Sequence, residues 1–97
     1  MKLVSVKPAS DGVHKYAATF ENGSGVAKKT TKFGAAGMDD YTKTKDKEQR
    51  ARYLQRHSSN ENWSDPTSAG SLSKHLLWGE STSMMANLRA FRNKFNL

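Results

Sequence analysis

Cysteine is absent from this sequence of 97 residues, so the chain forms neither disulfide bonds nor thiolate metal ligands. An intracellular or virus-internal setting therefore suits it better than secretion. Long apolar runs are absent as well, because no stretch approaches the roughly 18 apolar residues of a membrane span. The N-terminal segment MKLVSVKPAS has too short an apolar run for a signal peptide. We therefore expect a protein that is not secreted and does not insert into a membrane.

Motifs of known catalytic chemistry are missing too. The sequence contains no GxSxG, no HExxH, no Walker phosphate loop and no dinucleotide fingerprint. The three histidines, His14, His57 and His75, fall on separate predicted elements without metal-ligand spacing. The adjacent carboxylates Asp39 and Asp40 point apart in an extended segment and suit turn capping better than catalysis. We expect no catalytic residue, no cofactor and no metal site, and hence no enzymatic activity.

Apolar residues are few for the length of the chain. Hydrophobic residues make up 35% of the sequence, and the mean hydropathy is −0.82. A chain of this size and composition buries only a thin core and forms one domain. We therefore expect a single small domain over residues 1–97, with a β-meander in residues 1–34 and a helical part in residues 44–97.

The first third of the chain has the pattern of β-strands. Residues Lys2–Lys7 and His14–Phe20 alternate apolar and polar side chains, as half-buried strands do. The dipeptides Asp11-Gly12 and Asn22-Gly23 are typical of the tight turns in antiparallel hairpins. A third strand over Val26–Phe33 completes a predicted three-stranded antiparallel meander.

The predicted third strand carries three lysines. Lys28 and Lys32 lie on one face, and Lys29 lies on the other. Neither face is strongly apolar, which is typical of an edge strand whose lysines discourage edge-to-edge aggregation. The same lysines are also candidates for binding an anionic ligand, and the sequence leaves both interpretations open.

Glycines mark the change from strands to helices. The segment Phe33–Gly37 (FGAAG) permits a tight turn or a close backbone approach. Residues Lys45–His57 are good helix formers, and Thr44 is placed to cap them. We expect the inward face of this helix to carry Lys47, Ala51 and Leu54, with Tyr53 beside it.

The same helix carries a polar stripe on another face. Lys45, Gln49, Arg52 and Arg56 follow the spacing i, i+4, i+7, i+11. Such a stripe can line up on phosphates, and it is also typical of a solvated helix face. The spacing alone does not decide between the two.

Two more helices are predicted after a polar loop. Asp65 and Pro66 suit the N-cap and the first helical position of the second helix, and Gly79 suits its left-handed C-cap. Ser81 or Ser83 is placed to open the third helix. The order β-β-β-α-α-α predicts an α+β fold in which about three helices pack on one face of the sheet.

Large apolar residues in the helical part indicate the core. Trp78 adjoins two leucines, so we expect it to be buried, and we favour burial for Trp63 over stacking on bases. The third helix has an apolar stripe of Met84, Leu88, Phe91 and Phe95.

Four segments in a fixed order resemble a known family. They are KFGAAGMDDYT, KDKEQRARYLQRH, ENW and DPTSAGSLSKHLLWG, and they lie between Lys32 and Gly79. This ordered set resembles a small uncharacterised domain family of giant nucleocytoplasmic large DNA viruses and some protists. The resemblance implies a viral or virus-derived origin and a place in the virion, or in the cytoplasm or nucleus of the infected cell. It carries over no catalytic residues.

Positive charge is concentrated in one part of the chain. Residues 28–57 contain nine lysines and arginines against four acidic residues, which is +5 of the net charge of +7. Such a local field attracts anionic partners. The candidate binding residues are Lys28, Lys29, Lys32, Lys45, Arg52 and Arg56.

Two classes of function fit these observations. The favoured one is a small basic viral structural protein, a virion or minor-capsid-type component that docks on acidic protein surfaces of the capsid during assembly. The second is a nucleic-acid-binding protein that places lysines and arginines on phosphates, although no known nucleic-acid motif is present. A host-interaction protein is a third alternative. The sequence carries no signal for an oligomeric state.

Overall fold

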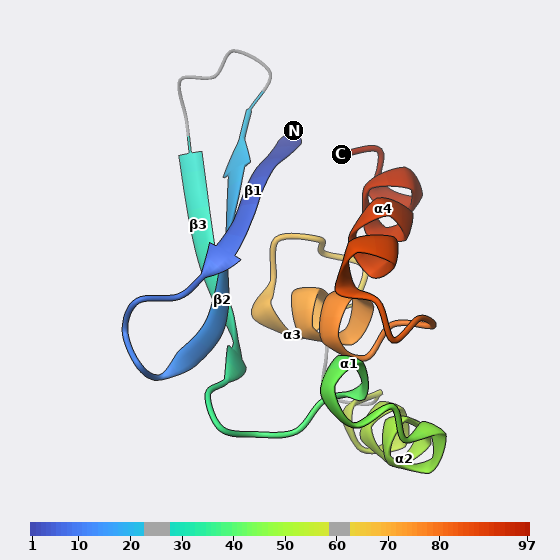
Figure 1. Cartoon of the computed structure of the whole chain (residues 1–97). Coiled ribbons are helices and arrows are strands. Elements are labelled where there is room, and N and C mark those ends of the chain that lie inside the picture. Colours follow the sequence, from blue (N-terminus) through green and yellow to red (C-terminus); the bar gives the residue numbers. More distant parts are fainter. Residues whose placement is uncertain (23–27, 59–62) are drawn as a thin grey trace.

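A computed structural model describes residues 1–22, 28–58 and 63–97 of the chain. Three strands come first: β1 (Lys2–Pro8), β2 (His14–Glu21) and β3 (Lys28–Ala35). They pair antiparallel in the order β1-β2-β3, so the predicted meander is confirmed. Figure 1 shows the helices gathered on one side of this sheet, as the predicted α+β fold requires.

The turn between β1 and β2 is closed by Asp11. Its Oδ1 accepts hydrogen bonds of 2.9 Å from the backbone N–H groups of Val13 and His14. Gly12 adopts a positive φ of 73° there, as the Asp-Gly pair predicts. Gly23 of the predicted second turn, and Val26 and Ala27 at the start of the predicted third strand, lie outside the described residues.

One face of the sheet is apolar and is covered by the helices. Leu3, Phe20 and Phe33 are each 1% exposed, and Tyr16 stacks on Phe33 with 5.9 Å between ring centroids. The strand register places short polar side chains and lysines on the outer face. Within the described chain β3 pairs only with β2, so its expected place at the sheet edge is confirmed.

Two helices follow the sheet, α1 (Tyr41–Thr44) and α2 (Lys47–His57). The predicted helix start at Lys45 is wrong, because Lys45 has a φ of 59° and ends α1 in a left-handed conformation. Asp46, and not Thr44, caps α2 by accepting from the backbone N–H groups of the second and third helical residues. An ionised carboxylate is a stronger acceptor for these donors than a hydroxyl is.

The buried face of α2 also differs from the predicted one. Tyr53 is 8% exposed, whereas Lys47 and Ala51 are exposed and Leu54 is half-buried. The tyrosine ring stacks on Trp78, so the largest apolar body of the helix sets its orientation. The helix period alone favoured the face that contains Leu54, because it carries no information about the contact between Tyr53 and Trp78.

The next helical segment consists of α3 (Ala69–Leu72) and a π-helical stretch, η1 (Ser73–Leu77), that continues it directly. Ser68 caps α3, so the predicted start at Asp65 and Pro66 is three residues too early. Asp65 instead closes the preceding turn, where its Oδ1 accepts from the backbone N–H and the hydroxyl of Thr67 at 2.9 and 2.8 Å.

Gly79 is not the left-handed C-cap that the sequence predicts, because its φ is not positive. It is needed for close packing instead. A Cβ at this position would lie 2.4 Å from the carbonyl oxygen of His75 and 2.6 Å from the side chain of Asn87. The Asn87 amide in turn donates to the carbonyl of Leu76 at 3.1 Å and holds α4 (Met84–Phe95) against η1.

The core joins the inner sheet face to the helices. Ser83 caps α4, and the predicted apolar stripe of this helix is confirmed, with Phe91 at 1% exposure. Trp78 is 7% exposed, so its expected burial is confirmed, and Trp63 is half-buried. No helix in the described ranges combines the length and apolar character needed to cross a membrane.

Candidate functional site

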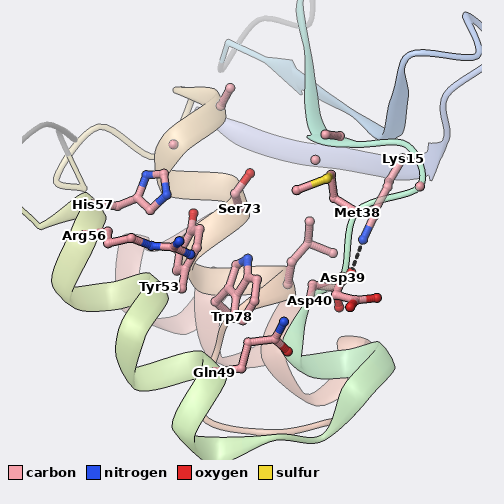
Figure 2. A pocket seen from close by; sticks show the side chains of 16 residues that line it. Lys15, Met38, Asp39, Asp40, Gln49, Tyr53, Arg56, His57, Ser73 and Trp78 are labelled. Atoms are coloured by element: carbon pink, nitrogen blue, oxygen red, sulfur yellow. Dashed lines mark hydrogen bonds and ion pairs between the residues drawn. The ribbon is translucent and has the colours of Figure 1, made fainter.

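A pocket of about 560 Å³ lies beside the corner where the sheet gives way to the helices. The segment from Gly34 to Asp40 forms one wall, and α2, α3 and η1 form the others, so we call it the corner pocket. Figure 2 shows Arg56 and His57 of α2 on the side opposite Met38. This pocket joins the glycine corner to one side of the charged helix that the sequence singled out.

Two glycines shape the corner wall. Gly34 has a φ of 74° and Gly37 a φ of 82°, both in the left-handed region where residues with a Cβ are strained. A Cβ at Gly34 would also lie 2.8 Å from the Cδ1 atom of Leu77. The FGAAG segment therefore serves both purposes that the sequence indicates, a tight turn and a close approach.

Asp40 has a structural role in the corner wall. It is 3% exposed, caps α1, accepts from the Thr42 hydroxyl and forms an ion pair with Lys15 of β2. Figure 2 shows this ion pair as a dashed line at the end of the pocket. The expected capping role of this aspartate is confirmed. Its exposed neighbour Asp39 pairs with Lys43 at 3.6 Å.

Three stacked rings form the wall on the side of α2. The Tyr53 ring lies between His57 and Trp78, with centroid distances of 4.2 and 4.3 Å. Two of the three residues are four apart on one helix, which places them on one face. The spacing of Tyr53 and His57 could therefore have predicted their contact from the sequence. No sequence pattern linked either residue to Trp78, which is more than 20 positions away.

Arg56 is the cation of the corner pocket that is left without a carboxylate partner among the described residues. The pocket's two aspartates are each paired with a lysine. Arg56 is exposed at the rim, and in the described ranges no hydrogen bond or ion pair engages its guanidinium. Within the described chain, the rim of the pocket therefore carries a guanidinium without a partner beside an apolar and aromatic wall.

The lysines of β3 lie elsewhere, on the sheet. Lys28 and Lys32 are on its outer face, 3.8 Å from the carboxylate of Glu21 and 3.5 Å from that of Asp11. Lys29 is on the inner face and donates to the Thr67 hydroxyl at 3.0 Å. None of the three lines the corner pocket.

The other three candidate residues lie at the helical end. Lys45 is in the link between α1 and α2, so it is not part of the predicted helical stripe. Arg52 and Arg56 are both exposed on α2, and only Arg56 lines the corner pocket. The six predicted residues are therefore divided between the two faces of the sheet and the helical end.

Metal ligands do not gather anywhere in the part of the chain that the structure describes. No group of three or more histidine, cysteine, aspartate or glutamate side chains is placed to hold an ion there. His14 bonds to Asp11 through Nδ1 at 2.8 Å, and His75 lies among the rings of Phe91 and Phe95. The histidines are thus dispersed, as their positions in the sequence indicate.

One family model matches the chain, over residues 4–57, which is more than half of its 97 residues. Its description is a family of unknown function, DUF5754. The chain belongs to this family. The DUF5754 match contains the glycine corner, α1 and α2, whereas Ser73 and Trp78 of the corner pocket lie beyond it. No curated protein and no solved structure matches the chain significantly.

Proposed function

We propose that this protein is a small, non-enzymatic structural protein that docks an acidic segment of a partner protein in the corner pocket. The observation that carries the proposal is Arg56, which has no hydrogen-bond or ion-pair partner among the described residues and lies at the rim of a concave site whose two aspartates are already paired with lysines. An incoming carboxylate would find there a guanidinium that is free to form a bidentate ion pair.

The shape of the site supports a protein partner. A pocket of about 560 Å³ with an aromatic wall accepts an apolar side chain, while a charged rim accepts an acidic neighbour. Anchors of this kind, a buried apolar group beside a charged pair, account for much of the affinity in protein interfaces.

Nucleic acid is the alternative partner. A duplex presents a regular row of phosphates and is best matched by a continuous basic surface. The candidate cations of this chain are instead divided between the two faces of the sheet and the helical end, and Lys28 and Lys32 already lie near carboxylates. This division favours a protein partner. A host-directed partner would use the same pocket and is a variant of the same proposal.

We further propose that the protein acts in a viral setting. This part of the proposal rests on the resemblance of residues 32–79 to a domain family of giant nucleocytoplasmic large DNA viruses. In that setting the partner is a capsid protein with an acidic surface, and the protein is found in the virion and in the infected cell.

Two single variants of α2 test the use of the corner pocket. Arg56→Gln removes the rim charge, and Arg52→Gln removes an equal charge from an exposed position outside the pocket. Glutamine forms helices well, so both variants should fold. We expect the affinity for a short peptide of alternating glutamate and leucine to fall about tenfold in Arg56→Gln, as loss of a charged hydrogen bond does, with little change in Arg52→Gln.

Fluorescence anisotropy at several salt concentrations provides the measurement. An equal loss of peptide affinity in both variants, together with salt-dependent binding to duplex DNA of any sequence, would favour the nucleic-acid alternative. The viral part has its own test, which is quantitative mass spectrometry of purified particles. A constant ratio of this protein to the major capsid protein would support a virion role, and its absence from particles would contradict it.

A further inference from the structure

A second pocket, of about 460 Å³, lies on another side of the helical part. Its lining comes from the first turns of α2, from η1 and the loop after it, and from α4. We call it the cationic pocket, because Arg50, Lys74 and Lys94 line it and Glu80 is the only carboxylate residue among its lining residues. None of these four residues lines the corner pocket.

Arg50 is held in place by the backbone. Its Nε donates to the carbonyl oxygens of Trp78 at 3.0 Å and Gly79 at 2.9 Å, and its guanidinium lies 5.7 Å from the centre of the Tyr41 ring. In the described part of the chain no acceptor engages its two Nη groups. A guanidinium fixed in this way presents its remaining donors without a further loss of side-chain freedom on binding.

Lys74 brings a second charge to the same pocket from η1. It is half-buried, with its ammonium group 5.1 Å from the centre of the Trp63 ring. Burial lowers the pKa of Lys74, and the charges of Lys94 and Arg50 lower this pKa further. Lys94 and Arg50 are thus each close enough to Lys74 to disfavour its charge, and Glu80 offsets only part of that effect.

His75 adds no charge to the pocket near neutral pH. Burial, followed by the charge of Lys74, lowers the pKa of His75 to about 4. Its ring packs against Phe91, and its Nε2 atom is buried without a hydrogen-bond partner in the described ranges. The positive charge of the site therefore comes from one arginine and two lysines.

We propose that the cationic pocket binds a phosphate group through Arg50, Lys74 and Lys94. Three cations against one carboxylate leave an excess of two positive charges, which a phosphate dianion balances and a single carboxylate does not. Its oxygens can accept from donors on α2, η1 and α4 at once. The neighbouring wall contains Ala86, Ala90 and Phe91, which leaves apolar surface for the organic part of a phosphate monoester.

Isothermal titration calorimetry at constant ionic strength tests this site with two probes, inorganic phosphate and phenyl phosphate. We expect saturable binding of phosphate that weakens about tenfold or more in Lys74→Gln and in Lys94→Gln. Lys47→Gln is the matched control, because it removes one charge from an exposed position on α2 that does not line the pocket. Lys94 is exposed, so its variant remains informative if the Lys74 variant unfolds.

The two probes distinguish the source of the phosphate. Tighter binding of phenyl phosphate supports a phosphorylated small molecule, and equal binding of both probes supports free phosphate. Absence of saturable binding, or equal weakening in Lys47→Gln, would overturn the proposal. Arg56→Gln should leave phosphate binding unchanged, which separates this site from the peptide site of the corner pocket.

Discussion

The indole ring of Trp78 and the phenol ring of Tyr53 lie almost parallel, with 4.3 Å between their centroids and 7° between their planes. One residue follows η1, and the other is at the middle of α2. The stack therefore ties the charged helix to the rest of the domain and provides the aromatic wall of the corner pocket. It also joins Tyr53, which lies within the region that the DUF5754 family model matches, to Trp78, which lies beyond that region.

Removal of the Trp78 ring should therefore destabilise the whole domain. We expect Trp78→Ala to lower the free energy of unfolding by about 3–5 kcal/mol, as large aromatic truncations in cores do. Urea denaturation followed by circular dichroism measures the loss. Trp63→Ala is the control, because that indole is half-buried, and its effect should be clearly smaller. A loss below about 1 kcal/mol for Trp78→Ala would contradict its place in the core.

Two of the glycines at positive φ, Gly12 in the turn between β1 and β2 and Gly34 in the corner, provide a matched pair of variants. The Cβ that Gly12→Ala adds would have no atom within 4 Å. This variant should therefore lose only the stability that a left-handed backbone costs a residue with a Cβ, about 1–2 kcal/mol. Gly34→Ala has a similar φ and also brings a Cβ to 2.8 Å from Leu77, so its cost should be larger by about 1–3 kcal/mol. Chemical denaturation of both variants measures the difference. Equal costs would mean that the close approach to Leu77 is unimportant.

The buried ion pair between Lys15 and Asp40 should be sensitive to loss of one partner. Asp40→Asn leaves the ammonium of a largely buried lysine without its counter-charge, and we expect a loss of about 3–5 kcal/mol. Asp39→Asn is the control, because the exposed pair with Lys43 is worth only about 0–1 kcal/mol. Thermal unfolding in the same buffer compares the two. Similar unfolding temperatures for both variants would rule out a structural role for the buried pair.

His75 should make the stability depend on pH in the mildly acidic range. Its pKa falls from 6.5 to about 4 in the folded protein, because burial disfavours the imidazolium form. The unfolded chain binds this proton more tightly than the folded protein does. The contribution of His75 to the free energy of unfolding is therefore fully present above the unfolded pKa and falls as the pH decreases from 6.5 toward 4. Proton NMR should show the His75 ring neutral at pH 5.5.

The variant His75→Phe should remove this dependence, because phenylalanine carries no titrating group and leaves no unpaired buried nitrogen. Urea denaturation at a series of pH values between about 4 and 7 compares it with the parent chain. An unchanged slope in the variant would assign the dependence to other groups.

The sequence predicted the elements that depend on neighbouring residues. Alternating side chains and the Asp11-Gly12 turn were enough for the meander, because hairpin pairing joins residues that are close along the chain. The stripe of α4 and its start after Ser83 were also local signals. Helix starts near Lys45 and Asp65 were predicted at the wrong residues, because several capping residues lie close together there and compete.

The sequence by itself determined the fold class, the edge strand, the dispersed histidines and the positive charge. The tertiary structure alone decided which cations are near one another and which are already paired, as with Lys28 beside Glu21 and Arg56 beside the corner pocket. It also brought Arg50, Lys74 and Lys94 together from three separate helical segments. Side-chain patterns report contacts within a few residues, whereas a pocket is made by packing between residues distant in the chain, and packing depends on the shape of the whole core.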